Sequence, residues 1–330
     1  MTPIETKYRD TVNRLAIALL FFEGLFLVTG GVTGVLSLLT ASMNDVVADV
    51  FEELVGGLMY CIVFLLPVFL FRLVSTGKPT VPMQLELRMP SDTPLYLFSG
   101  IAVITGAAYL NGYLVSIFDY SSFSEEVLWT QSTSANYQLI LAFLTTAVIP
   151  AFVEEFLFRG LILSNLRPFG TTTAVVASAV LFGMMHQNIE QLLYTTVAGL
   201  VLGYVYVKTA SIWPCVIMHF VNNFVSVLRS VLIERLSVNA ANLAIGMVQA
   251  TFCILGILSA VALMHKQKDK RRAVLATGCF EQDLDAHPDY VAEAILLRRR
   301  IRLFFSVPMI VFFVLCVLQM LLVIGLALLY

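Results

Sequence analysis

The sequence has 330 residues, of which 59% are hydrophobic and 13% are charged, and its formal net charge is −2. A soluble globular domain has about 45–50% apolar and about 25% charged residues, so the composition excludes an ordinary soluble fold. The near-neutral charge leaves no basic surface for nucleic acid, and no nucleic-acid partner is expected. The five cysteines are scattered without a CxxC pair, which argues against a disulfide framework and against a cysteine-based zinc cluster.

Long apolar runs predict an all-α polytopic membrane bundle, because a spanning helix needs about 20 apolar residues. About nine transmembrane helices are expected, at Leu15–Leu39, Leu54–Val74, Leu95–Ile117, Tyr137–Phe158, Thr172–Met185, Leu192–Val207, Ile212–Leu228, Ala240–Met264 and Leu303–Leu329. The fifth and sixth are short for full spans, so we expect either short helices or re-entrant segments there. The first run is longer than the apolar core of a signal peptide, and we expect it to remain as a span.

Lysine and arginine predict the orientation of these helices, since cytoplasmic loops carry the excess of basic residues. With the N-terminus in the cytoplasm and nine alternating helices, all of the 20 basic residues except Arg229 and Arg235 fall on the inner side. The C-terminus is then expected outside. The lipid bilayer is the one partner that this composition requires.

The chain divides by composition into four expected parts. Residues 1–130 hold the N-terminal helices and loops, and residues 131–265 hold a membrane bundle with the polar motifs. Residues 266–302 form a charged segment, expected to be a cytoplasmic loop, and residues 303–330 form a last helix. Two GxxxG pairs, Gly30 with Gly34 and Gly199 with Gly203, are expected to allow close packing between helices.

Ionisable residues inside a membrane are costly, so each one is a candidate for function. Glu154, Glu155 and Arg159 lie in one apolar helix. Glu155 and Arg159 are i,i+4 neighbours that can form an ion pair, while Glu154 is rotated by about 100° from Glu155. One carboxylate can therefore be structural while the other does acid/base work. Pro150 removes a hydrogen bond to the Thr146 carbonyl and should bend the helix just before them.

Two further pairs show the same helical spacing. Phe182 and His186 share a helix face, and so do His219 and Asn223. The remaining histidines, His265 and His287, lie next to and within the charged segment and carry no such pattern. Glu23, Asn111 and Gln319, which are isolated polar residues in other spans, are expected to be structural.

Together these residues resemble the CPBP family of intramembrane proteases, which includes the type II CAAX prenyl endopeptidases and bacterial Abi-type proteins. The three family motifs EExxxR, FxxxH and HxxxN stand here as Glu154 to Arg159, Phe182 to His186 and His219 to Asn223, in the family order. The resemblance spans roughly Tyr137 to Arg235. It implies an intramembrane endopeptidase that acts on a membrane-associated peptide or protein, in a bacterial plasma membrane.

The resemblance also implies a role for each motif residue. Glu154 would activate a water, and Glu155 would pair with Arg159 and hold the helix. His186 and His219 would stabilise the oxyanion, and Asn223 would support His219 or the oxyanion directly. Phe182 is expected to be a packing residue that fixes the helix of His186. Glutamate-driven chemistry is the mechanism we expect.

Three alternatives remain open at the level of sequence. Glu154, His186 and His219 would also make a zinc site with an open position. A non-catalytic membrane scaffold or bacteriocin-immunity-type protein would keep the fold without proteolysis. A transporter would use the same groups as a proton relay, but it predicts an inverted repeat that the sequence lacks.

The depths of the two histidines pose a geometric problem. Counted from the inner ends of their helices, His186 lies about 21 Å deep and His219 about 12 Å. A tilted helix, a fifth helix that begins below the membrane surface, or re-entrant segments would bring them together.

Overall fold

The computed structural model describes residues 1–76, 80–87, 89–117, 136–277 and 297–327, and these residues contain helices and no strand. The predicted all-α class is therefore confirmed. The helices are α1 Pro3–Thr40, α2 Asp45–Val74, α3 Thr93–Ile117, α4 Asn136–Ala142, η2 Phe143–Val148, α5 Ile149–Glu155, η3 Phe156–Leu163, α6 Ser164–Leu166, η4 Arg167–Phe169, α7 Thr171–Met185, α8 Ile189–Thr209, α9 Trp213–Arg235, α10 Val238–Thr277, α11 Leu297–Phe304 and α12 Val307–Ala327.

Eight helices in the described ranges are long and apolar enough to cross a membrane. The fifth expected segment, α7, has 15 residues and is short, as the sequence indicated. The sixth, α8, has 21 residues and is longer than its apolar run predicted. The Asn188 side chain accepts a hydrogen bond from the Glu190 N–H and starts this helix early. At the other end, Ala210 adopts the left-handed conformation and ends it.

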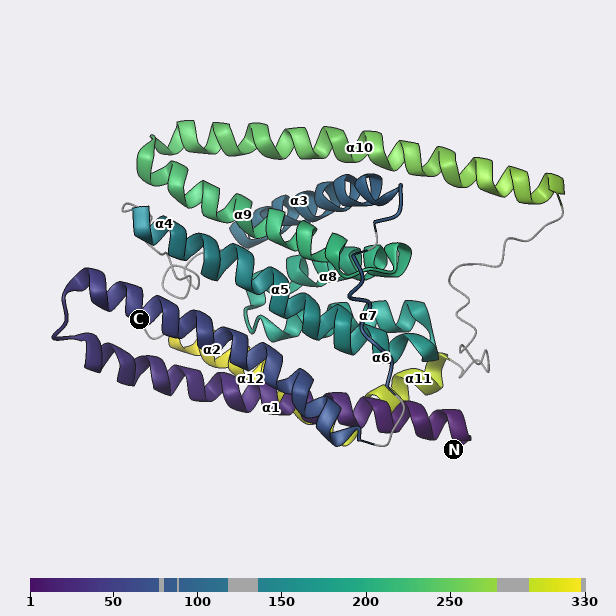
Figure 1. The fold of residues 1–330 in the computed structure, drawn as a ribbon, viewed down its shortest axis with the longest axis horizontal. Coiled ribbons are helices and arrows are strands. Elements are labelled where there is room, and N and C mark those ends of the chain that lie inside the picture. The colour runs from purple at the N-terminus through teal and green to yellow at the C-terminus, as the bar shows by residue number, and fades with distance from the viewer. Residues whose placement is uncertain (77–79, 88, 118–135, 278–296, 328–330) are drawn as a thin grey trace.

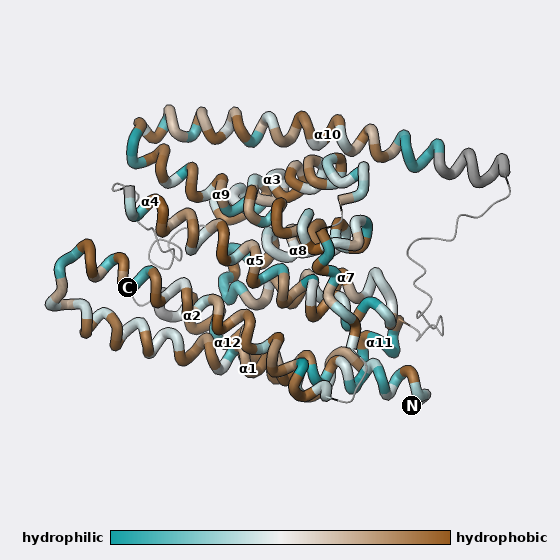
Figure 2. The backbone as a smooth tube through the Cα atoms, in the orientation of Figure 1, coloured by the Kyte–Doolittle hydropathy of each residue, from teal (hydrophilic) through white to brown (hydrophobic). Residues whose placement is uncertain are grey.

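The bundle has an inner group of helices between two outer groups (Figure 1). On one side α1 packs against α2 and α12, and on the other side α3 packs against α10. The continuous run from α4 to η4 lies between them, together with α7, α8 and α9. Figure 2 shows hydrophobic residues along most of these helices. Large apolar side chains such as Leu38, Ile257 and Leu322 are exposed on the outside, where a bilayer would solvate them.

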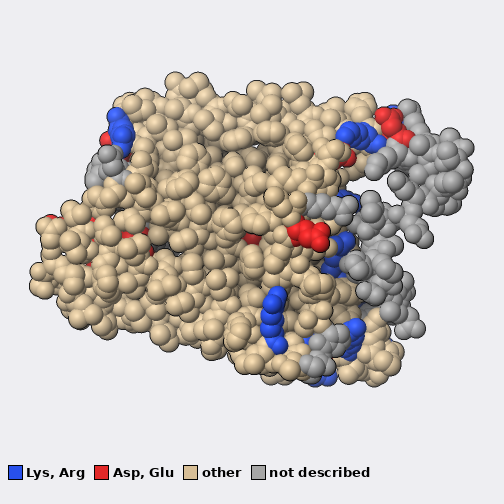
Figure 3. All heavy atoms as spheres, in the orientation of Figure 1, with Lys and Arg blue, Asp and Glu red and all other residues tan. Residues whose placement is uncertain are grey.

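Most of the Lys and Arg side chains on the face shown in Figure 3 gather toward the end of the bundle where the N-terminus lies. This distribution agrees with the predicted orientation, which stays a prediction. The charged segment was expected to be a loop from residue 266, and this is wrong for its first part. Helix α10 continues to Thr277, well beyond its apolar part. Lys266 on this extension pairs with Asp92, just before α3.

The central helix runs without interruption from Tyr137 to Phe169, 33 residues in all, and extends beyond the Phe158 end that we expected. Two π-helical segments, η2 and η3, flank α5. In η2 the Ile149 N–H bonds to the Leu144 carbonyl, five residues back, directly before Pro150. A wider turn of this kind accommodates a proline without ending the helix.

Close packing by glycine is confirmed for one of the two GxxxG pairs. A Cβ added to Gly199 would lie 2.9 Å from the Ala179 Cα, so α8 and α7 touch backbone to backbone. Gly203 is similarly close to Val175 and Leu163. The prediction is wrong for Gly30 and Gly34, where an added Cβ would meet nothing within 4 Å. Both glycines lie on an exposed face of α1.

Candidate active site

Glu155 and Arg159 form the expected ion pair at the centre of the bundle. Arg159 Nη1 donates to Glu155 Oε1 at 2.9 Å, and both side chains are 0% exposed. Arg159 also donates from Nη2 to the Gly199 carbonyl at 3.1 Å, and its guanidinium lies 4.8 Å from the centre of the Phe182 ring. The close approach of α8 at Gly199 makes this carbonyl reachable. The pair therefore joins the central helix to α7 and α8.

His219 on α9 joins the same carboxylate. Its Nδ1 lies 2.9 Å from Glu155 Oε1. A carboxylate only accepts hydrogen bonds, so Nδ1 carries the proton and donates it. The other ring nitrogen, Nε2, then points toward Glu154, with 3.9 Å between Nε2 and Glu154 Oε2. That separation is too long for a direct hydrogen bond and leaves both atoms available to a molecule that lies between them.

Glu154 is buried and does not touch the arginine, as its rotation on the helix predicted. Its Oε1 accepts a hydrogen bond from the Tyr60 hydroxyl on α2. Its Oε2 has no hydrogen-bond partner among the described residues and faces His219. Tyr60 was not predicted from the sequence. It lies outside all three motifs, and a single tyrosine in an apolar span carries no spacing that would single it out.

His186 meets the cluster through Phe182. The Nδ1 atom of His186 donates to the Phe182 carbonyl at 2.9 Å, which leaves Nε2 free of its own helix. The Phe182 ring lies 4.9 Å from the His186 ring and 5.9 Å from the His219 ring, and it packs edge-on against Phe158. Phe182 is therefore the packing residue that the sequence predicted, and it contacts both histidines.

The contact between Phe182 and His219 bears on the predicted depth problem. By residue count Phe182 lies about 17 Å from the start of α7, whereas His219 lies about 9 Å from the start of α9. Their ring centres are 5.9 Å apart. Helices α7 and α9 must therefore be offset or inclined relative to each other, as the sequence required.

Asn223 has a different contact from the one expected. Its Nδ2 donates to the Thr146 carbonyl at 3.1 Å, and no hydrogen bond joins it to His219 in the described structure. In a regular helix the N–H of residue 150 would donate to the Thr146 carbonyl, but Pro150 has no N–H. The neighbouring Asn222 donates to Asn223 Oδ1 at 3.1 Å. The amide of Asn223 thus ties α9 to the π-helical segment before Glu154.

The zinc alternative can be tested against this geometry. Glu154 Oε2 and His219 Nε2 are 3.9 Å apart, which an ion about 2.0–2.2 Å from each would allow. However, the described residues contain no group of three His, Cys, Asp or Glu side chains placed to hold one ion. His186 therefore does not complete a three-ligand site in this arrangement.

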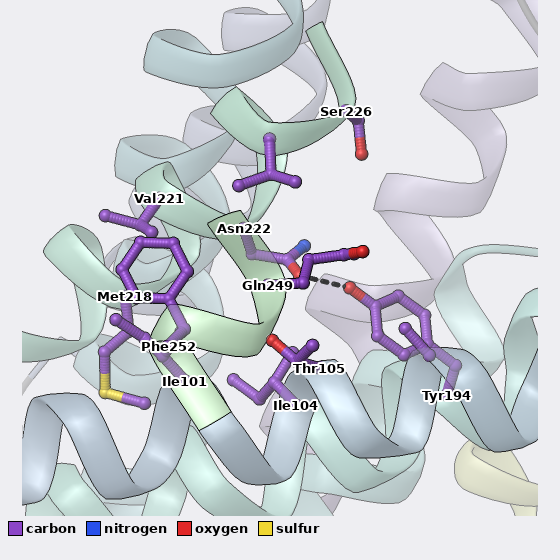
Figure 4. Close-up of a pocket in the computed structure, with 12 residues that line it drawn as sticks. Ile101, Ile104, Thr105, Tyr194, Met218, Val221, Asn222, Ser226, Gln249 and Phe252 are labelled. Atoms are coloured by element: carbon purple, nitrogen blue, oxygen red, sulfur yellow. Dashed lines mark hydrogen bonds between the residues drawn. The ribbon is translucent and has the colours of Figure 1, made fainter. Parts of the chain in front are cut away.

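A cavity of about 190 Å³ lies between α3, α8, α9 and α10 (Figure 4). Tyr194 and Asn222 line it and are joined by a hydrogen bond of 2.5 Å. Neither Glu154 nor His219 lines this cavity, which faces Met218 and Asn222 on α9. Asn222 connects it to the candidate site through a hydrogen bond to Asn223.

Comparison with known proteins supports the predicted resemblance. Residues 136–225 match the family model of the Rce1-like type II CAAX prenyl endopeptidases, and all three motifs lie in that range. The match leaves α1, α2, α3, α10, α11 and α12 outside it. No curated protein and no solved structure shows a significant similarity to the chain.

Proposed function

We propose that this chain is an intramembrane endopeptidase that hydrolyses a peptide bond of a membrane-associated peptide or protein. One observation carries the proposal. Glu154 Oε2 and His219 Nε2 face each other across 3.9 Å, while the other polar atom of each side chain is bound elsewhere. A reacting water or carbonyl oxygen between them would meet a base on one side and an imidazole on the other.

Glu154 is the general base in this proposal. Its free Oε2 takes a proton from a water, and the resulting hydroxide adds to the carbonyl carbon of the scissile bond. The C–N bond then breaks as Glu154 returns the proton to the leaving amine, so the carboxylate is restored. Tyr60 holds Oε1 throughout, which directs Oε2 toward His219.

His219 stabilises the oxyanion, and Glu155 keeps it in place for that task. Protonated at both nitrogens, His219 donates from Nδ1 to Glu155 and from Nε2 to the developing oxyanion. Before water is activated, the cluster holds two carboxylates, one guanidinium and one imidazolium, and their charges sum to zero. When Glu154 takes the proton, the oxyanion carries the second negative charge and the sum stays zero. A neutral cluster is the arrangement that a water-poor interior tolerates best.

His186 and Asn223 take supporting parts. With Nδ1 held by the Phe182 carbonyl, His186 keeps Nε2 available for the substrate carbonyl or its oxyanion. Asn223 acts through the backbone, because it holds the π-helical segment before Glu154. In this account Glu154, His186 and His219 touch the reacting atoms, and Glu155, Arg159 and Asn223 position them.

The substrate is expected to enter from the membrane or from its cytoplasmic side. The basic end of the bundle supports an N-terminus in the cytoplasm and a C-terminus outside. A bacterial plasma membrane is the location that the resemblance to Abi-type proteins implies. A membrane-associated peptide or protein is the substrate class that the apolar outer surface favours.

The test compares peptide termini in cells that carry the wild type or Glu154→Gln, with both proteins inserted at equal levels. New termini that disappear with the substitution would identify the substrate and show that Glu154 is essential. Identical termini in the two strains would instead favour a non-catalytic membrane scaffold or immunity-type protein with the same fold.

A further inference from the structure

Glu23 is a buried carboxyl in the first membrane helix, far from the three motifs in sequence. It is 1% exposed, at a level of α1 that is otherwise lined by apolar residues such as Phe22. A carboxyl in such a place is unfavourable unless hydrogen-bond donors surround it. The sequence alone suggested only a structural role for Glu23.

Three donors from two distant segments reach this carboxyl. Gln187 Nε2 donates to Oε2 at 2.9 Å, and Cys316 Sγ donates to Oε1 at 3.3 Å. Gln319 on α12 also bonds to it through its side chain. Glu23 therefore joins three parts of the chain, namely α1, the turn between α7 and α8, and the C-terminal helix α12.

Gln187 directly follows His186, and its backbone is unusual. Its φ angle of +51° lies in the left-handed region, which residues other than glycine seldom adopt. The N–H groups of His186 and Gln187 close the last turn of α7, and Asn188 then caps α8. The side chain of Gln187, held by Glu23, fixes this turn and with it the backbone that carries the His186 imidazole.

We infer that Glu23 is a positioning residue for His186, and that it makes the placement of this histidine depend on the docking of α12. The inference rests on the proposed function in so far as His186 acts on the substrate. Neither α1 nor α12 lies in the segment that matches the family model. The site in that segment is thus completed by helices from both ends of the chain.

The experiment exchanges the two partners in the full-length purified protein. Glu23→Gln leaves one acceptor oxygen for donors that now bind two separate oxygens, and Gln187→Glu replaces the donor with an acceptor. The double variant restores a donor–acceptor pair with the two roles reversed. Cys316→Ala removes one donor from α12, whereas Cys316→Ser keeps a donor there. Glu52→Gln, at the far end of α2 where Glu52 pairs with Thr40, is the matched control.

Two quantities are measured. The first is the ring signal of His186 in protein labelled with ¹⁵N-histidine, assigned by a His186→Gln variant, and it requires no turnover. The second is the split between kcat and KM on the substrate found with Glu154→Gln. We expect each single variant to shift the His186 signal but not the His219 signal, and to lower kcat about tenfold with little change in KM.

The double variant should restore both quantities, and Cys316→Ala should act in the same direction as Glu23→Gln while Cys316→Ser and Glu52→Gln do not. A His186 signal that stays unchanged in folded Glu23→Gln and Gln187→Glu would overturn the inference, whatever the activity. If Glu23→Gln does not fold, Gln187→Ala provides the same comparison. A shifted His186 signal in a protein without proteolysis would keep the inference and reject the proposed function.

Discussion

Asn223 donates a hydrogen bond to the Thr146 carbonyl at 3.1 Å. In a regular helix this carbonyl would accept from the N–H of residue 150, which is a proline and has none. The effects of Pro150 and Asn223, which are far apart in sequence, therefore meet at one carbonyl. The proline frees a carbonyl, and the asparagine of another helix binds it. Asn223 supports Glu154 through the backbone rather than through His219.

This contact predicts that Asn223→Ala destabilises the protein by about 0.5–1.5 kcal/mol, the net contribution of one hydrogen bond, because the exposed Thr146 carbonyl loses its donor. Thermal unfolding in detergent measures the change. Asn223→Asp should behave similarly, since a carboxylate cannot donate. In a Pro150→Ala background, where an N–H is available to Thr146, the loss should be smaller. An equal loss in both backgrounds would show that the contact with Thr146 does not matter.

The two adjacent carboxylates should respond in opposite ways to the same substitution. Glu154→Gln should abolish turnover and leave the unfolding temperature close to that of the wild type, because Glu154 is not part of the ion pair. Glu155→Gln leaves Arg159 as an uncompensated buried charge, and we expect a loss of about 3–5 kcal/mol. Thermal unfolding and substrate cleavage, measured on the same preparations, check both. The assignment of roles fails if Glu154→Gln is the less stable variant.

Tyr60 should matter for the rate but not for substrate binding. Tyr60→Phe removes the hydroxyl that holds Glu154 Oε1, and the loss of one hydrogen bond to a charged group corresponds to about tenfold or more in kcat. KM should change little. Tyr113→Phe, at an exposed position on α3, is the matched control. Equal kcat for Tyr60→Phe and Tyr113→Phe would remove Tyr60 from the site.

Gly199 should tolerate no side chain. Gly199→Ala places a Cβ 2.9 Å from the Ala179 Cα, so α8 must move away from α7 and the Gly199 carbonyl must move away from Arg159. We expect a loss of about 1–3 kcal/mol from this overpacking. Gly30→Ala, where nothing lies within 4 Å of the new Cβ, should be neutral or slightly stabilising. Thermal unfolding of the two variants side by side is the test.

Activity should not depend on bound zinc. Purified protein that has been treated with a chelator and separated from it should keep its turnover within about twofold, because no three described side chains converge on one ion. The measurement pairs metal content with cleavage rate. Stoichiometric zinc in the active protein, together with loss of turnover on chelation and recovery on adding zinc, would establish the metal mechanism instead.

The sequence by itself determined the features that depend on composition or on spacing within one helix. Apolar runs gave the membrane bundle, and the short α7 followed from its 15 residues. The ion pair between Glu155 and Arg159 followed from i,i+4 spacing, and so did the separation of Glu154 from that pair. These are local properties that hold wherever the helix lies in the molecule.

Only the tertiary structure decided which helices meet and at what rotation. Tyr60 and Glu154 are 94 residues apart in the chain, and His219 and Glu155 are 64 apart. Such contacts depend on the crossing of whole helices, which a periodic pattern does not encode. For the same reason the sequence did not predict the contact between Asn223 and Thr146 or the contact between Glu23 and Gln187.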